Sequence, residues 1–189
     1  MRVKKYMKRF PISIYKWGKH NYCPPTWAEL KLTEKTLYIK MTSLECNPLS
    51  RYTHGPDANV YCDSCVEFFF SFNGLQPAYL NIEMNSIGGY HCAYHREVGV
   101  KEYCSPFVEG GAPKATVIED SWYVEATFDL DQLKGLFGIS EIKSIAANFY
   151  KCGDETEKPH YGMWNEVIWE TPSFHRPEFF RNIPLEEIK

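Results

Sequence analysis

Carboxylates and amides alternate with apolar residues in two short segments of the chain. Glu67, Phe69 and Ser71 alternate with Val and Phe in residues 66–72, and Asn81, Glu83 and Asn85 alternate with Leu, Ile and Met in residues 80–85. Successive side chains of a β-strand point to opposite faces, so each set shares one face of its strand. This mixture suits a sugar, because a pyranose ring packs its C–H face on an aromatic plane while its hydroxyls need polar partners.

Two other interpretations of the same residues stay open. An outward strand face with this composition is often only a solvated surface. Alternatively, Glu67 and Glu83 form the carboxyl pair of a glycoside hydrolase. Hydrolysis needs one carboxyl with a raised pKa, and neighbours on an open face are expected to stay ionised. We therefore predict non-catalytic binding and no enzyme activity.

Cysteine and histidine supply no predicted metal site. Cys62 and Cys65 have the spacing of a zinc knuckle or a redox pair, but no second pair of this spacing completes four ligands. Small buried thiols explain them better. His91 and His95 are expected in a loop, as solvated or hydrogen-bonded side chains rather than ligands.

A structural calcium ion is the remaining cofactor option, and no other cofactor is expected. Its ligands would be Asp63 and the acidic residues of the loop 154–157. Calcium takes six to eight oxygen ligands, which carboxylates and backbone carbonyls provide.

The segments that must position these residues are mostly strands. Residues 37–42, 66–72, 80–85 and 122–128 each alternate apolar and polar side chains, which is the period of a strand with one dry face. Residues 142–150 are a further strand candidate. The core is expected to contain the following residues: Val66, Phe68, Phe70, Leu80, Ile82 and Met84.

One short helix is predicted over residues 129–137, where Leu130, Leu133, Leu136 and Phe137 have helical spacing and Gly138 ends it. Turn clusters rich in Gly and Asn separate the other segments. The predicted fold is all-β, a two-sheet antiparallel β-sandwich with one short helix, and residues 1–189 form a single domain.

Composition limits the partners and the compartment. The chain has 189 residues, a net charge of −3 and no Lys/Arg block after its first nine residues, so a nucleic acid is not expected as a partner. No segment approaches the roughly 20 apolar residues that span a bilayer, and residues 10–15 are too short and polar for a signal peptide. Seven cysteines, an odd number at irregular spacings, suit reduced thiols. We expect a cytoplasmic protein that does not bind membranes.

Three runs of the chain together resemble the family 9 carbohydrate-binding modules, and in particular the single-domain, intracellular proteins similar to them. Residues 60–69 carry an aromatic residue, Asp-Ser and a Val-Glu-hydrophobic strand, and residues 79–88 carry Tyr-x-Asn-x-Glu-x-Asn. Residues 147–180 carry a closing strand, Trp164 and a Pro-Glu-x-Phe turn. The order and spacing match over about residues 20 to 185.

The resemblance implies a sandwich that grips a mono- or oligosaccharide, often at a chain end, between two aromatic side chains. By position these are Tyr61 and Phe174, where family members can have tryptophan. The implied polar contacts are Glu67, Asn81 and Glu83.

The sequence departs from the family pattern at several positions. Tyr and Phe offer less stacking area than Trp, Arg181 stands where the family tends to have Gly, and Met163 rather than Ser precedes Trp164. A protein-interaction domain with a decayed sugar site is therefore a further alternative, because fold analogy does not fix function.

Overall fold

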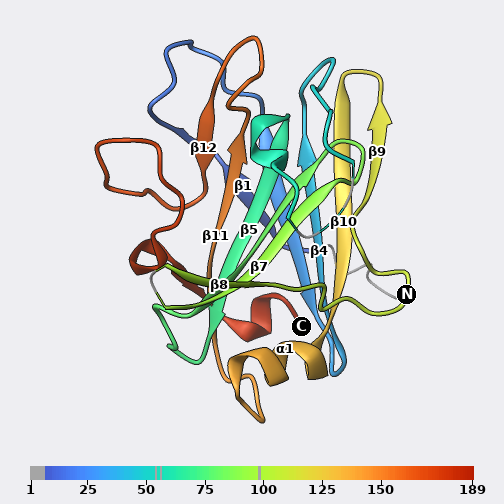
Figure 1. Cartoon of the computed structure of the whole chain (residues 1–189), viewed down its shortest axis with the longest axis vertical. Coiled ribbons are helices and arrows are strands. Elements are labelled where there is room, and N and C mark those ends of the chain that lie inside the picture. Colours follow the sequence, from blue (N-terminus) through green and yellow to red (C-terminus); the bar gives the residue numbers. More distant parts are fainter. Residues whose placement is uncertain (1–6, 54, 56, 98) are drawn as a thin grey trace, which may run out of the picture.

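The computed structural model consists of two packed antiparallel sheets and describes residues 7–53, 55, 57–97 and 99–189 (Figure 1). The predicted β-sandwich is thus confirmed.

The first sheet has five strands, and one of its faces is dry. In spatial order they are β1 (Arg9–Ile12), β3 (Thr26–Leu32), β4 (Thr36–Ser43), β10 (Ser121–Asp129) and β9 (Lys114–Ile118). Buried residues alternate with partly exposed ones along β4 and β10, as the sequence predicts for residues 37–42 and 122–128. The other face of this sheet meets solvent.

The second sheet has eight strands. Seven follow the order β2 (Ile14–Tyr15), β12 (Tyr161–Met163), β11 (Ile145–Cys152), β5 (Cys65–Phe72), β6 (Tyr79–Asn85), β7 (Tyr90–Glu97) and β8 (Val100–Tyr103). β13 (Arg181–Ile183) pairs with β11. The predicted strand at residues 142–150 therefore begins three residues later, at Ile145.

The main core lies between the sheets. It contains all six core residues expected from the alternation of β5 and β6, each with no exposed surface: Val66, Phe68, Phe70, Leu80, Ile82 and Met84. The predicted register is correct, since a slip of one residue would have turned these side chains to the opposite face.

The second face of the eight-stranded sheet is covered, contrary to the open face expected from sequence. β5, β6 and β11 are buried at every residue. A second apolar cluster on this face joins Phe69 and Tyr150 of the sheet to Val60, Val167 and Phe174 of the connecting segments. The alternation in residues 66–72 and 80–85 predicts which side chains share a face of β5 and β6. It does not predict that irregular segments far away in sequence cover the polar face of these strands.

The predicted helix is confirmed as α1 (Leu130–Phe137), which lies at the lower end of the sandwich in Figure 1. The Asp129 carboxylate accepts hydrogen bonds from the backbone N–H groups of Asp131 and Gln132, and Gly138 ends the helix with φ 65°. The described residues also form three single-turn 3-10 helices, η1 (Val60–Cys62), η2 (Pro177–Phe179) and η3 (Leu185–Glu187).

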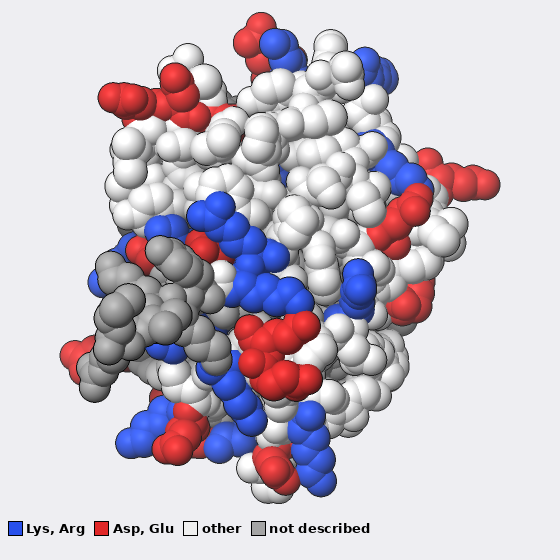
Figure 2. Space-filling view, turned by 180° about the vertical axis from the view of Figure 1, so that it is seen from behind, with Lys and Arg blue, Asp and Glu red and all other residues white. Residues whose placement is uncertain are grey.

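Charges of both signs share the surface. Lys and Arg intermix with Asp and Glu over the lower half of the face in Figure 2, whose upper half is largely uncharged. Within the described residues, no helix combines the length and the apolar character that a membrane crossing requires.

Candidate functional site

A pocket of about 710 Å³ lies on the covered face of the eight-stranded sheet. Side chains of β5, β6, β7 and β8 line it together with Tyr61 of η1, Asp154 after β11 and the segment from Pro172 to Pro177. The connecting segments that bury this face thus leave a hollow above the strands.

A row of polar side chains crosses the sheet at the pocket. Tyr150 on β11, Glu67 on β5, Glu83 on β6 and His91 on β7 are partners in register. Directly opposed residues of antiparallel strands have Cβ atoms only about 5 Å apart, so the two carboxyl groups are immediate neighbours.

Asn81 fixes the carboxyl group of Glu83. Its side-chain NH₂ donates to Glu83 Oε1 at 2.9 Å, and its carbonyl oxygen accepts from His95 Nε2 at 2.9 Å. The other oxygen, Glu83 Oε2, is buried and has no hydrogen-bond partner among the described residues. A buried oxygen left without a partner calls for a ligand or water, because its desolvation is otherwise uncompensated.

Both glutamates favour the protonated form. Burial raises the pKa of Glu83 to about 8. Burial, the neighbouring Cys152 and Glu83 together raise the pKa of Glu67 well above its ordinary value. The expectation that both carboxyls stay ionised on an open face is therefore wrong, and its cause is the unforeseen cover over the strand face.

Tyr61 and Asp154 form one wall of the pocket. The backbone N–H of Asp154 donates to the carbonyl of Tyr61 at 3.2 Å, which ties the loop after β11 to η1. Tyr61 lines the pocket and is 42% exposed, so part of its surface is accessible to a ligand. Burial and the charge of Glu155 raise the pKa of Asp154 to about 6.

Phe174 contributes to the pocket from the opposite end of the sequence. It is only 8% exposed, and its ring stacks on Tyr150 with centroids 4.1 Å apart and planes at 14°. The Trp17 ring lies 6.0 Å from it. Phe174 is thus held rigidly, with much of its surface already used in packing.

Four of the five residues expected at the site line this one pocket, namely Tyr61, Glu67, Glu83 and Phe174. Asn81 has no exposed surface and lies behind the pocket wall, where it bonds to Glu83 and His95. Its position is that of a residue that orients the site.

Sequence reasoning missed an aromatic and histidine group beside the glutamates. Tyr79 stacks on His95 with centroids 4.4 Å apart, and its hydroxyl lies 2.7 Å from His175 Nδ1. Tyr79 and His175 lie inside the runs that resemble the family, so those runs contained a signal for them.

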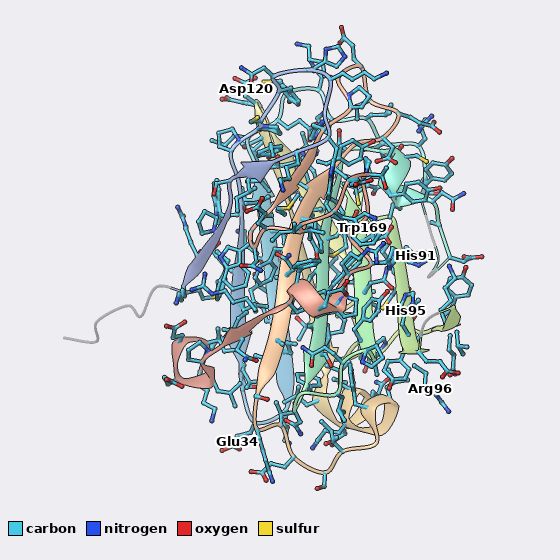
Figure 3. All side chains as sticks on the ribbon, turned by 90° about the vertical axis from the view of Figure 1, so that its left-hand side faces the viewer. Glu34, His91, His95, Arg96, Asp120 and Trp169 are labelled. Carbon is cyan, nitrogen blue, oxygen red and sulfur yellow. The ribbon has the colours of Figure 1, made fainter. Side chains whose placement is uncertain are left out.

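His91 and His95 were wrongly expected in a loop. Both project from the same side of β7, four residues apart, and line the pocket (Figure 3). Burial is the main cause that lowers the pKa of His91 to about 4 and that of His95 to about 3. Both rings are therefore neutral at pH 7.

The expected calcium ligand Asp63 does not fit that role. Its carboxylate accepts from the backbone N–H groups of Arg51 and Tyr52, from the Arg51 Nε and from the Asn85 amide, all within 3.1 Å. The Arg51 guanidinium also pairs with Glu155 at 2.9 Å. Arginine and backbone donors thus take up the oxygens that a calcium ion would need.

The Cys62 and Cys65 thiols are both buried and free, and they lie in η1 and at the start of β5. Their burial agrees with the interpretation of both residues as small buried thiols.

Comparisons with known proteins give a family for the chain. The model of the family described as "Carbohydrate-binding family 9" matches residues 2–185. A putative carbohydrate-binding protein from Bacteroides uniformis shares 25% identity and a TM-score of 0.76, over 93% of this chain and 85% of that one. A search of curated proteins found no match.

Two solved structures of a family 9 module from Caldicellulosiruptor kristjanssonii have the same fold. The glucose complex gives a TM-score of 0.57 at 14% identity, over 93% of this chain and 82% of that one. The cellotriose complex gives 0.59 at 13% identity, over 93% and 80%. With a family model that spans nearly the whole sequence, the chain belongs to carbohydrate-binding family 9.

Proposed function

We propose that the pocket binds a mono- or oligosaccharide without hydrolysing it. The observation that carries this proposal is that one pocket is lined both by the exposed aromatic residue Tyr61 and by Glu83, whose buried oxygen Oε2 has no hydrogen-bond partner among the residues that the structure describes. Membership of family 9 supports it. The related modules that were solved with glucose and with cellotriose support the same class of ligand.

Protonated carboxyls suit sugar hydroxyls particularly well. With a pKa of about 8, Glu83 carries a proton at neutral pH, so it offers one O–H donor and one acceptor. A sugar hydroxyl also donates and accepts. Glu83 and Glu67 therefore match a neutral polyol without leaving a buried charge.

Tyr61→Ala is the direct test of the stacking contact. Loss of the ring should weaken binding of glucose or cellotriose by about 1–3 kcal/mol, which is roughly ten- to hundredfold. Titration calorimetry measures the change. Tyr123→Ala, which removes a tyrosine from the outward face of the five-stranded sheet, is the matched control and should leave affinity unchanged.

Phe174 needs a milder substitution, because its ring packs on Tyr150. Phe174→Leu should lower both affinity and stability, so its thermal unfolding must be measured beside its affinity. Unchanged affinity in both Tyr61→Ala and Phe174→Leu would show that neither ring contacts the sugar.

The variant Glu67→Gln distinguishes a glycoside hydrolase from a non-catalytic binding protein. A retaining enzyme needs one ionised carboxylate as nucleophile, whereas burial favours the protonated form of both Glu67 and Glu83. In a binding protein this variant lowers affinity, because an amide cannot reproduce both roles of the acid. In an enzyme it abolishes release of reducing sugar while binding survives.

We also propose a reducing, cytoplasmic environment for the protein. All seven cysteines are free thiols in the structure, and their number is odd. Titration of the denatured, unreduced protein should count seven thiols. A count of one would indicate three disulfides and a different compartment.

A further inference from the structure

Two cysteines and a glutamate converge at the floor of the pocket. Cys65 and Glu67 are two residues apart on β5 and therefore share one face, and Cys152 on β11 is the register partner of Cys65. Glu67 and Cys152 line the pocket, which gives this cluster an entry path from solvent.

The three side chains have the mutual distances of metal ligands. The two Sγ atoms and a Glu67 oxygen all lie within 4.8 Å of one another, and Cys152 Sγ is 2.9 Å from Glu67 Oε1. Around a tetrahedral zinc ion, with bonds of roughly 2.0–2.3 Å, two ligand atoms are separated by about 3.5 Å. Small side-chain rotations are enough to reach that geometry.

A second observation, on the strand next to this cluster, points to a missing ligand. Glu83, the register partner of Glu67, has its buried Oε2 without a hydrogen-bond partner among the described residues. Cys65, Glu67 and Cys152 are also buried, each with at most 3% of its surface exposed. A bound cation would stabilise the anionic forms of all three.

We propose that Cys65, Glu67 and Cys152 bind a zinc-class ion at the floor of the pocket, with its fourth position directed towards Glu83 and the pocket. Two thiolates select zinc or another soft metal over calcium or magnesium, which prefer sets of oxygens. Binding replaces three protons by one divalent ion. Cys62 is not a ligand in this site. The second thiol beside Cys65 is Cys152 on β11, and the Cys62–Cys65 pair of the sequence does not form the site.

The metal site does not depend on the proposed sugar function, although Glu67 and the buried oxygen of Glu83 are common to both. Its test is therefore run without sugar. Fully reduced protein is incubated with Zn²⁺, desalted, and analysed for metal per chain by mass spectrometry. Cobalt substitution then reports thiolate ligation through its charge-transfer absorption.

We expect one tightly held ion per chain and a thiolate-to-cobalt band. Cys152→Ser should remove the band and weaken zinc binding at least about tenfold. Substituting a residue that only hydrogen-bonds to a metal ligand already costs about that much, and Cys152 is proposed as a ligand itself. Cys104→Ser is the matched control, since Cys92 and Cys104 form another close thiol pair, 3.9 Å apart, which is outside the cluster. It should bind zinc as the wild type does.

Glu67→Gln provides a second variant if Cys152→Ser does not fold, because it keeps both thiols and removes only the carboxylate. It too should lose affinity for zinc. The proposal is overturned if the reduced wild type retains no zinc above the buffer level, if zinc binding survives both substitutions, or if Cys65 and Cys152 prove to be joined in a disulfide.

Discussion

Glu83 illustrates how a single residue is controlled by its neighbours. Asn81 fixes one of its oxygens, the other is buried with no hydrogen-bond partner in the part of the chain that the structure describes, and burial raises its pKa to about 8. The folded protein therefore binds a proton here that the unfolded chain releases above about pH 4.5. The stability that this group contributes is complete below pH 4.5 and is lost as the pH rises towards 8.

The pocket histidines act in the opposite direction. Their lowered pKa values mean that they contribute stability above pH 6.5, which is lost as the pH falls towards 4. Above about pH 7.5 the pocket histidines are neutral in both the folded and the unfolded state, so between about pH 7.5 and 8 only the buried carboxyls of the pocket still hold protons that unfolding releases. The wild type should therefore lose stability over this range, measured by urea unfolding at several pH values.

Glu83→Gln should flatten that pH dependence, because an amide has no proton to lose. Glu102→Gln, which changes an exposed glutamate on β8, is the control and should keep the wild-type slope. Equal slopes for wild type and Glu83→Gln would show that Glu83 is ionised in the folded protein at neutral pH.

At the scale of elements, the segment 164–180 covers the polar face of β5 and β6 and forms part of the pocket wall. Asn148 on β11 anchors it: the Asn148 side chain donates to the Asn165 carbonyl at 2.8 Å and accepts from the Asn165 N–H at 2.9 Å. The Asn165 side chain then donates to the Phe179 carbonyl at 2.8 Å. This chain of hydrogen bonds sets the position of the loop that carries Phe174.

Asn148→Ala should weaken sugar binding although the residue does not line the pocket. The substitution leaves the Asn165 N–H and carbonyl unpaired, at a cost of about 1–3 kcal/mol. Hydrogen exchange should then accelerate in residues 165–180 while β4 and β10 stay protected. Unchanged exchange in that segment would show that other contacts hold it.

The same elements show what the sequence could predict. Alternation correctly assigned β4, β5, β6 and β10 and the register of β5 and β6, and helical spacing assigned α1 with its Asp129 and Gly138 boundaries, because these depend on local periodicity and capping. It also placed Glu67 and Glu83 on one face. The burial of that face, the inward histidines of β7 and the contact of Cys152 with Glu67 depend on long-range packing, which no local period encodes.

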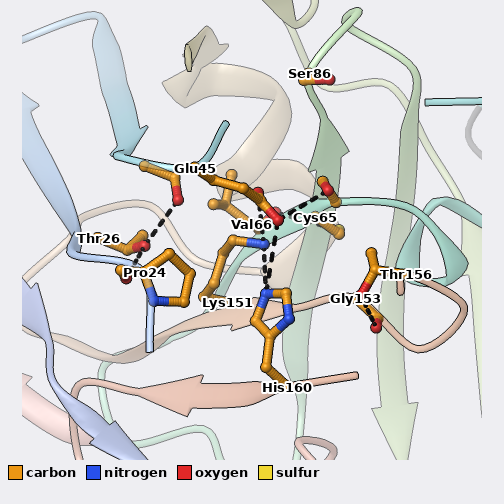
Figure 4. A network of polar contacts seen from close by, with 12 residues as sticks. Pro24, Thr26, Glu45, Cys65, Val66, Ser86, Lys151, Gly153, Thr156 and His160 are labelled. Carbon is orange, nitrogen blue, oxygen red and sulfur yellow. Dashed lines mark hydrogen bonds and ion pairs between the residues drawn. The ribbon is translucent and has the colours of Figure 1, made fainter. Parts of the chain in front are cut away.

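At the scale of the whole molecule, a buried ion pair joins the two sheets. Lys151 on β11 has no exposed surface, and its Nζ lies 3.0 Å from Glu45 Oε2, 2.8 Å from His160 Nε2 and 3.0 Å from the Cys152 carbonyl (Figure 4). Glu45 in turn accepts from the indole N–H of Trp122 on β10 at 3.0 Å. Burial opposes ionisation of Glu45, but Lys151 and Trp122 outweigh it and lower its pKa.

This network should stabilise the sandwich only while both charges are present. Lys151→Met leaves the Glu45 carboxylate buried without its counter-ion, which should cost about 3–5 kcal/mol of unfolding free energy. The double variant Glu45→Gln with Lys151→Met removes both charges and should recover part of that loss, since a neutral amide still accepts from Trp122. Denaturant unfolding of the two single variants and the double variant gives the coupling energy.

Lys143→Met, at an ion pair whose side chains are 73% and 72% exposed, is the control and should change stability by less than about 1 kcal/mol. If Lys151→Met is no more harmful than this control, water reaches Glu45 and the two sheets are held together by apolar packing alone.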